Sequence, residues 1–350
     1  MSDLPLVELT SAACLAAITA YVLFGGADFG GGVWDLLATG PRAKAQRALI
    51  ADTISPIWEA NHVWLILVVV ILFTGFPSAY ARISVSLHIP LTLMLVGVVL
   101  RGSAFTFRSY DRRDDDVQRR WGMVFAVASL VTPVLLGLAA GTVAGGGVTA
   151  PGRRSFTEAY VLPWLAPFPL AIGVLTLLLF AFLAAVYLTV EARDVDLAGD
   201  FRRRALWSGG ALLPIAAVAL WLARDAAPWI FTELVEAAWA PVLHLLTASA
   251  ASIALLALWQ RQYRVARTAA ATQTALIVSG WGLAQWPWLL PPTLSAYDAA
   301  APTATLALLV GALTIGAVVL FPALGYLFAI FGRAASGEQR TANSEGPTTP

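Results

Sequence analysis

The sequence has little charge and a single cysteine. Charged residues make up 12% of its 350 positions and apolar residues 59%, whereas a soluble domain carries about 25% charge. This composition excludes an ordinary soluble domain. The lone Cys14 excludes an intramolecular disulfide and a thiolate metal cluster. The formal net charge of +1 gives no reason to expect a nucleic-acid partner.

The chain also has few of the side chains that build redox or hydrolytic centres. A haem buried among helices needs axial His, Met or Cys ligands, and the sequence holds three His and three Met in all. His88 and His244 stand alone in apolar segments, which favours hydrogen-bonded core histidines over ligands. The sequence has no C-x-x-C-H, no His pair on one helix and no nucleophile–base constellation. We therefore expect no metal site, no redox cofactor and no catalytic residue in this chain alone.

What the sequence does have is long apolar segments. A spanning helix needs about 20 mostly apolar residues, and nine segments qualify: Val7–Asp28, Glu59–Phe76, Ile83–Phe107, Trp121–Ala144, Leu165–Val190, Leu206–Ala223, Pro241–Gln260, Thr268–Leu290 and Thr303–Phe331. The sequence thus predicts an all-α, polytopic membrane protein. We expect the nine helices to divide into two four-helix bundles plus one peripheral helix, although no sequence repeat marks that division.

Shorter segments complete the predicted organisation. Pro41–Ile54 is basic and amphipathic, which is typical of a helix lying at the membrane interface. Pro228–Ala240 is a second interfacial candidate, with tryptophans as anchors. We expect residues 1–335 to form one transmembrane domain. The polar, Ser/Thr/Pro-containing stretch 336–350 is expected to be a disordered cytoplasmic tail.

The distribution of basic residues predicts the orientation. Lys and Arg concentrate in cytoplasmic loops. With nine spans, 18 of the 22 Lys and Arg fall on one side and 4 on the other, and the alternation has no breaks. The N-terminus is therefore predicted to face outward and the C-terminus the cytoplasm.

The first polar group within the predicted spans is Asp28, inside the run Gly25-Gly26-Ala27-Asp28-Phe29-Gly30-Gly31-Gly32. Charged groups in hydrocarbon are costly and are often functional. Glycines permit close helix contact or a break in the helix. Asp28 is thus either a functional acid or a hydrated residue at a helix end.

The second group opens the second predicted helix. Glu59 and His62 are i,i+3 neighbours, and Asn61 lies between them. An acid, an amide and an imidazole on one helix face suit a proton relay. The alternative is an ordinary first turn, whose acid favours the helix dipole. The additional Asn, His and flanking Trp58 favour the functional interpretation.

The third group is Arg101, deep in the third predicted helix, with Arg108 seven residues further on. Arg108 suits an ordinary cytoplasmic flank. Arg101 lies deeper and needs an anionic partner. Asp28 and Glu59 lie at the same membrane side in the predicted topology, so either is a candidate.

Together these groups resemble subunit II of the cytochrome bd family of quinol oxidases. The resemblance covers nearly the whole chain. It rests on four stretches in order: Tyr21-Val22-Leu23 with Asp28-Phe29-Gly30 and Gly32; Pro56-Ile57-Trp58-Glu59-Ala60-Asn61-His62-Val63-Trp64-Leu65; Leu100-Arg101-Gly102 with Ala104-Phe105 and Phe107-Arg108; and Asp298-Ala299-Ala300 followed by Thr303–Leu306 and Pro322.

The resemblance implies a role in a bacterial cytoplasmic (inner) membrane. Subunit I of such oxidases holds b- and d-type haems and the quinol site, and the complex reduces oxygen to water. Subunit II ligates no haem and supports assembly, haem stability and proton access. The implied partners are subunit I, a small single-helix subunit, quinol and oxygen as substrates, and membrane lipid. A bound quinone or lipid within this chain is compatible with that role.

When the family motifs are carried over residue by residue, five residues match motif positions: Asp28, Trp58, Glu59, Asn61 and Arg101. Asp298 falls in the family's last loop. His62 stands where the family varies. Two family acids are replaced, by Gly25 and Thr106, which fits a divergent branch such as the cyanide-insensitive type.

From these positions we predict a proton pathway through Glu59, Asn61, His62 and Asp28, and structural or interface roles for Trp58, Arg101 and Asp298. The alternatives are a proton-coupled secondary transporter, which would show an internal repeat with paired broken helices, and a scaffold without functional polar residues.

Overall fold

The computed structural model describes residues 4–54, 58–110, 115–148, 155–320 and 322–323. Its helices are α1 (Leu4–Leu36), α2 (Ala43–Ile54), α3 (Trp58–Gly75), α4 (Pro77–Ser86), α5 (His88–Tyr110), α6 (Asp115–Ala144), α7 (Phe156–Tyr160), α8 (Pro167–Glu191), α9 (Val195–Ala226), α10 (Pro228–Glu236), α11 (Ala240–Trp259), α12 (Tyr263–Gln285) and α13 (Ala296–Ala299). A further helix covers Thr303–Leu320. Two short strands, β1 (Trp288–Leu290) and β2 (Leu294–Ser295), form an antiparallel hairpin.

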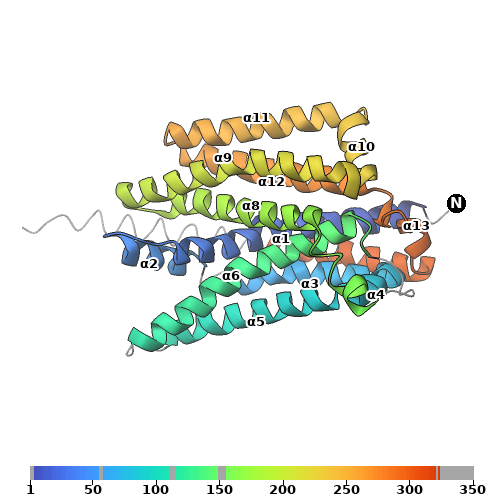
Figure 1. Cartoon of the computed structure of the whole chain (residues 1–350), viewed down its shortest axis with the longest axis horizontal. Coiled ribbons are helices and arrows are strands. Elements are labelled where there is room, and N and C mark those ends of the chain that lie inside the picture. The colour runs from blue at the N-terminus through green and yellow to red at the C-terminus, as the bar shows by residue number, and fades with distance from the viewer. Residues whose placement is uncertain (1–3, 55–57, 111–114, 149–154, 321, 324–350) are drawn as a thin grey trace, which may run out of the picture.

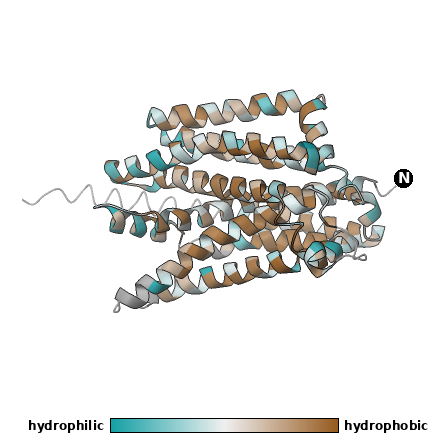
Figure 2. Ribbon diagram, in the orientation of Figure 1, coloured by the Kyte–Doolittle hydropathy of each residue, from teal (hydrophilic) through white to brown (hydrophobic). Residues whose placement is uncertain are grey.

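The long helices lie side by side along one axis (Figure 1). Helix α1 is central and contacts α3, α6, α8 and α12. On one side α5 packs on α6, and on the other α8, α9, α11 and α12 pack around one another. Brown, hydrophobic ribbon dominates the middle of these helices in Figure 2, as expected for a protein whose solvent is lipid.

The expectation of a polytopic membrane protein is confirmed. Among the described residues seven helices are long and apolar enough to cross a membrane, or eight if the bent pair α3–α4 counts as one span. Helix α12 has 23 residues and is continuous, but it is more polar, because its sequence includes Gln273, Thr274 and Gln285. These side chains are buried against the other helices instead of facing lipid.

The region after the second predicted helix was placed wrongly. The predicted helix Ile83–Phe107 is broken near Leu87 and divided between α4 and α5. Helix α3 ends at Gly75, and the chain bends by 119° before α4 begins at Pro77. Proline cannot donate the hydrogen bond that would continue α3, but it suits the first position of a new helix.

The eighth predicted helix was too long. Residues Thr268–Leu290 were expected to be one helix, but α12 ends at Gln285 and the β1–β2 hairpin follows. Trp286 precedes Pro287, and a residue before proline is disfavoured in helical conformation. The sequence at this boundary therefore explains the earlier helix end.

Helix α1 runs unbroken through its glycines, so the helix break that they permitted does not occur. Instead they allow close packing. A Cβ on Gly30 would lie 1.9 Å from the Phe180 carbonyl oxygen of α8, and one on Gly32 would lie 2.2 Å from Ser129 of α6. Small residues at helix contacts have this effect in membranes.

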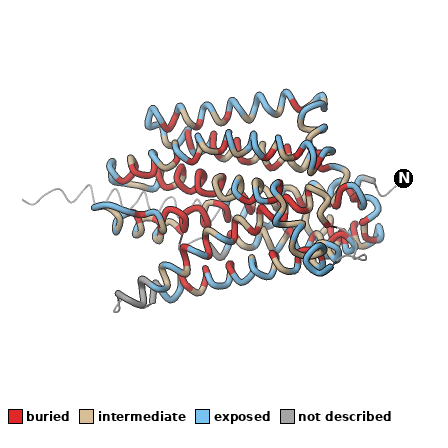
Figure 3. The backbone as a smooth tube through the Cα atoms, viewed as in Figure 1, coloured by how far each residue is buried: buried red, intermediate tan, exposed pale blue. Residues whose placement is uncertain are grey.

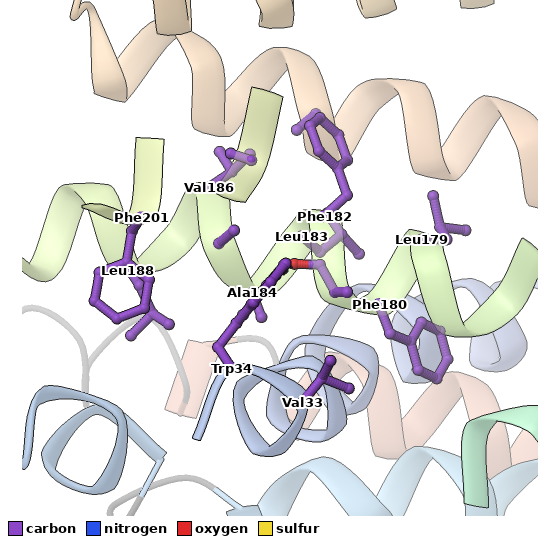
Figure 4. Close-up of a cluster of buried hydrophobic side chains, with 14 of the residues drawn as sticks. Val33, Trp34, Leu179, Phe180, Phe182, Leu183, Ala184, Val186, Leu188 and Phe201 are labelled. Carbon is purple, nitrogen blue, oxygen red and sulfur yellow. Dashed lines mark hydrogen bonds between the residues drawn. The ribbon is translucent and has the colours of Figure 1, made fainter. Parts of the chain in front are cut away.

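The buried centre of the molecule is the contact between α1 and α8. Figure 4 shows Trp34 of α1 lying against α8 near Phe180 and Ala184. Its indole Nε1 donates a 2.7 Å hydrogen bond to the Ala181 carbonyl oxygen. Buried backbone follows α1 and α8 in Figure 3, whereas α11 is mostly exposed.

Both interfacial segments are helical. Helix α2 turns Gln46, Ile50 and Ile54 inward, and α10 is held by a hydrogen bond from Trp229 Nε1 to the Ala144 carbonyl oxygen. The predicted tail, 336–350, and the end of the last predicted helix at Phe331 lie outside the described residues.

Candidate functional site

Four helices bring the polar residues of the sequence clusters together. Asp28 lies on α1 with 3% of its surface exposed. Asn61 of α3 donates a 2.6 Å hydrogen bond from Nδ2 to Asp28 Oδ2, and the same nitrogen lies 3.5 Å from the Phe24 carbonyl oxygen. Asp28 is therefore not a hydrated helix end but a buried acid with an amide donor.

His62 of α3 faces the same helix. Its ring lies 6.2 Å from the Tyr21 ring and 5.9 Å from the Phe29 ring, both on α1. Asn61 and His62 thus both contact α1. The side chains of Trp58 and Glu59, at the start of α3, lie outside the described part of the structure.

Arg101 of α5 is 1% exposed and is the largest fully buried side chain. Its guanidinium carbon lies 4.7 Å from the Phe29 ring centre and 5.2 Å from that of Phe125, distances typical of cation–π contacts. Arg101 Nε donates to Ser129 Oγ at 3.2 Å. Its Nη2 is buried without a hydrogen-bond partner.

The anionic partner predicted for Arg101 is not in direct contact. Within the described residues no carboxylate lies within 4.0 Å of its guanidinium nitrogens. Asp28 is the nearby acid whose negative charge acts on Arg101 over a longer distance. Arg101 is instead accommodated by the rings of Phe29 and Phe125 and the hydroxyl group of Ser129. Of these three, only Phe29 belongs to a sequence cluster.

Helix α6 supplies what sequence reasoning missed. Phe125 and Ser129 are i,i+4 neighbours on α6 and both contact Arg101. Gly32 of α1 packs directly against Ser129, and a Cβ added to this glycine would clash with the serine side chain. An aromatic residue and a serine one turn apart in an apolar helix are too common to signal a site from sequence.

A second polar cluster lies where α1 ends and α9 begins. We call this end of the molecule the basic end, since Arg42, Lys44, Arg47, Arg202, Arg203, Arg204, Arg261, Arg264 and Arg267 lie on the segments that meet there. Asp200 of α9 accepts two hydrogen bonds of 2.8 Å from Arg42, one of 2.8 Å from Gln46 and one of 2.6 Å from Arg203. These bonds fasten α2 to α9.

The ion pair with Asp200 also stabilises the charged form of Arg42. Hydrogen bonding to the Asp200 carboxylate raises the pKa of the Arg42 guanidinium above its ordinary value. Arg42 is therefore charged at neutral pH. The corresponding predicted helix began only at Leu206, but α9 begins at Val195, and Asp194 caps it by accepting from two backbone amides.

Within the described part of the chain, the remaining predicted residues make hydrogen bonds only with residues close to them in the sequence. Ser295 caps the short helix α13, and Asp298 in its first turn is the partner: Asp298 N donates to Ser295 Oγ at 3.1 Å, and Ser295 Oγ donates to Asp298 Oδ2 at 2.5 Å. His88 and His244 are exposed rather than in the core, and Nδ1 of each lies close to a backbone oxygen of a residue three or four positions earlier. In the described segments no three His, Cys, Asp or Glu side chains are placed to hold a metal ion.

Comparison with known proteins gives a consistent result. A family model described as cytochrome bd terminal oxidase subunit II matches residues 6–331. The putative cytochrome bd menaquinol oxidase subunit II of Bacillus subtilis is 21% identical over 324 residues, which span 89% of this chain and 92% of that protein. The cytochrome bd ubiquinol oxidase subunit 2 of the same organism is 33% identical over 97 residues, 27% of this chain and 28% of the relative.

The match to Escherichia coli cytochrome bd-I ubiquinol oxidase subunit 2 is also partial, with 27% identity over 43% of this chain and 40% of that protein. A chain in the structure of bd oxidase from Geobacillus thermodenitrificans has the same fold, with a TM-score of 0.78 and 21% identity over 93% of this chain and 98% of that one. Since the family model covers almost all of the sequence, this chain belongs to the cytochrome bd terminal oxidase subunit II family.

Proposed function

We propose that this chain is the non-haem subunit of a bd-type terminal oxidase, in which quinol oxidation drives the reduction of oxygen to water. Its own contribution is assembly, haem stability in the partner and proton access. The family match supports the proposal. The observation that carries the chain's own part is the buried hydrogen bond between Asp28 and Asn61.

The proposal includes the partners and cofactors of the complex. Subunit I supplies b- and d-type haems and the quinol site, and a small single-helix subunit completes the assembly. The complex lies in the bacterial cytoplasmic membrane, and a quinone or lipid binds within or against this chain. The names of the relatives, which include ubiquinol and menaquinol oxidase subunits, support a quinol as substrate.

In the membrane we propose nine spans, with the N-terminus outside and the C-terminus in the cytoplasm. To the seven apolar helices we add the bent pair α3–α4 and the more polar α12, which brings the number to nine. Helix α12 is included because it is as long as α5 and packs against α8 and α11. The basic end is then cytoplasmic. We propose two groups, α1–α3–α5–α6 and α8–α9–α11–α12, with Thr303–Leu320 as the additional helix; α1 and α6 of the first group both pack against α8 of the second.

The polar groups suit proton access for three reasons. A buried carboxylate is costly unless it is hydrogen-bonded or paired, and Asp28 has both Asn61 as a donor and the positive charge of Arg101 nearby. His62 and Glu59 add two titratable groups on the adjoining helix. Glu59 lies in the first turn of α3, two residues before Asn61.

The transporter alternative receives less support. It requires paired broken helices in two repeats. Within the described residues α3–α4 is the one bent pair, and the Gly-rich α1 is continuous. An intramembrane acid with a single broken helix suits a subunit that conducts protons to a neighbour.

The decisive experiment replaces Asp28 by Asn in the assembled oxidase. We expect the variant to retain its haem spectrum and to lose most quinol-driven oxygen uptake, because the amide has a similar shape but does not titrate as a carboxyl group does. Glu8→Gln is the matched control, an exposed acid on the same helix. Equal oxygen uptake by Asp28→Asn and wild type at every pH would exclude the proposed proton role.

A further inference from the structure

A surface groove lies between α9 and α11 at the basic end. It has a volume of about 350 Å³ and is lined by Arg202, Leu206, Leu255, Leu256 and Trp259. Four of its five lining residues are apolar. This volume is in the range of small-molecule sites, which run from roughly 300 to 1,000 Å³.

Arg202 is fixed in position beside this groove. Its Nε donates to the Leu258 carbonyl oxygen at 2.7 Å and its Nη2 to the Trp259 carbonyl oxygen at 3.1 Å. These carbonyls end α11, where the helix dipole is negative. The two bonds use two of the five guanidinium donors, so Arg202 keeps both its charge and further donors.

The charges around the groove are unbalanced. Arg261, in the left-handed region with φ 60°, and Arg264 are exposed on the adjoining turn and helix. Together with Arg202 they form no ion pair with another described residue.

The nearby acids are already engaged. Asp200 binds Arg42, Gln46 and Arg203, and Glu191 lies 3.4 Å from Arg267. Asp194 caps α9, and Asp196 lies 3.8 Å from Arg42. The positive charge at the groove is therefore available to a ligand.

The apolar side chains in and beside the groove are exposed. Trp259 is 71% exposed and Leu256 52%, and Trp207, next to Leu206 on α9, is 81% exposed. Helix α11 lies at the edge of the molecule, away from α5 and α6 (Figure 1). A tryptophan beside an arginine at a helix end is typical of the membrane–water interface.

We propose that the α9–α11 groove binds one anionic glycerophospholipid, with its phosphate at Arg202 and Trp259 and an acyl chain along Leu206, Leu255 and Leu256. Basic pockets between membrane helices on the cytoplasmic side bind anionic headgroups. The fixed guanidinium selects an anionic lipid, because a quinone has no charge to pair with it. The lipid stabilises the contact between α9 and α11. This site is independent of the proton role proposed for Asp28.

The experiment uses the purified oxidase complex with its subunits together. Bound phospholipid is quantified by mass spectrometry, and the melting temperature is measured with added phosphatidylglycerol or phosphatidylcholine. The variants are Arg202→Gln, which removes the charge, and Leu206→Trp, which fills the groove. Trp221→Ala is the matched control, since it removes an exposed tryptophan nearer the other end of α9.

We expect wild type and Trp221→Ala to retain one anionic lipid that both other variants lose. Phosphatidylglycerol should raise the melting temperature of the first two only, and phosphatidylcholine should raise none. An unchanged lipid content in both groove variants overturns the proposal, as does equal stabilisation by phosphatidylcholine. Loss of a co-purified quinone from Leu206→Trp, with lipid retained, identifies a quinone as occupant. Loss of subunit I from that variant identifies a subunit interface. Either result also overturns the proposal.

Discussion

Asn61 Nδ2 on α3 lies 2.6 Å from Asp28 Oδ2 on α1, and this hydrogen bond joins two helices through groups that are both buried. We expect Asn61→Leu to destabilise the complex by about 1–3 kcal/mol, because it leaves a buried carboxylate without its donor. The measurement is the melting temperature of the purified complex.

A double-mutant cycle isolates this hydrogen bond. Asn61→Leu should cost less in a background that already carries Asp28→Asn, since an amide is less costly to leave without a donor than a carboxylate. The expected coupling is about 0.5–3 kcal/mol. Additive effects of the two substitutions would show that the bond contributes little.

Arg101 is predicted to support assembly rather than turnover. Arg101→Leu removes the cation between Phe29 and Phe125 and leaves Asp28 without a nearby positive charge. We expect a lower haem content per complex. Arg101→Lys should recover it only in part, because an ammonium cannot stack on two rings as a guanidinium does. A normal haem spectrum for Arg101→Leu would contradict this assignment.

The sequence was sufficient to predict which helices hold the polar groups, but not how those groups pair. Asp28, Asn61 and Arg101 were identified because charged and amide groups are rare in apolar segments. The role of Ser129 and Phe125 could not be foreseen, because it depends on α6 lying against α1 and α5. Such packing is a tertiary property and leaves no local pattern.

The helix ends, too, could be predicted from the sequence only in part. Hydropathy located the apolar part of α9 but excluded its charged first turns, since Arg202, Arg203 and Arg204 resemble a loop. Those turns are helical because Asp194 caps them and Asp200 binds α2. The predicted helix end at Phe76 agrees with the bend before Pro77. Helix α4 was missed because its last residues, from Ile83, were joined to the apolar α5 in one predicted span.

Close packing of α1 on α8 gives a further prediction. A Cβ at Gly30 would meet the Phe180 carbonyl oxygen at 1.9 Å, so Gly30→Ala forces the helices apart. Overpacking of this kind costs about 1–3 kcal/mol, and the melting temperature should fall. Gly210→Ala on α9 is the control, since nothing lies within 4 Å of its Cβ position. There alanine should be neutral or stabilising by up to about 1 kcal/mol. Equal effects at both sites would contradict close α1–α8 packing.

The α2–α9 contact should depend on salt. Asp200→Asn removes the acceptor of Arg42 and leaves Arg42 and Arg203 as neighbouring like charges. We expect a lower melting temperature, with a smaller difference from wild type at high ionic strength, where the repulsion between the arginines is screened. Because the pKa of Arg42 is raised above an already high value, the effect should not vary with pH near neutrality. Asp196→Asn, whose partner is 3.8 Å away and whose side chain is 78% exposed, should change little.

Glu59 provides the sharpest test of proton access. It opens α3, which also carries Asn61 and His62, so we expect Glu59→Gln to slow quinol-driven oxygen uptake while the haem spectrum stays normal. The amide keeps the size of the side chain but has no negative charge and does not titrate. His62→Phe separates the two groups: it retains a ring beside Tyr21 and Phe29 but cannot titrate. If His62 relays protons from Glu59, the double variant should be no slower than Glu59→Gln alone, because both substitutions block one route. Further slowing in the double variant would indicate two routes, and wild-type uptake by Glu59→Gln at every pH would remove Glu59 from the pathway.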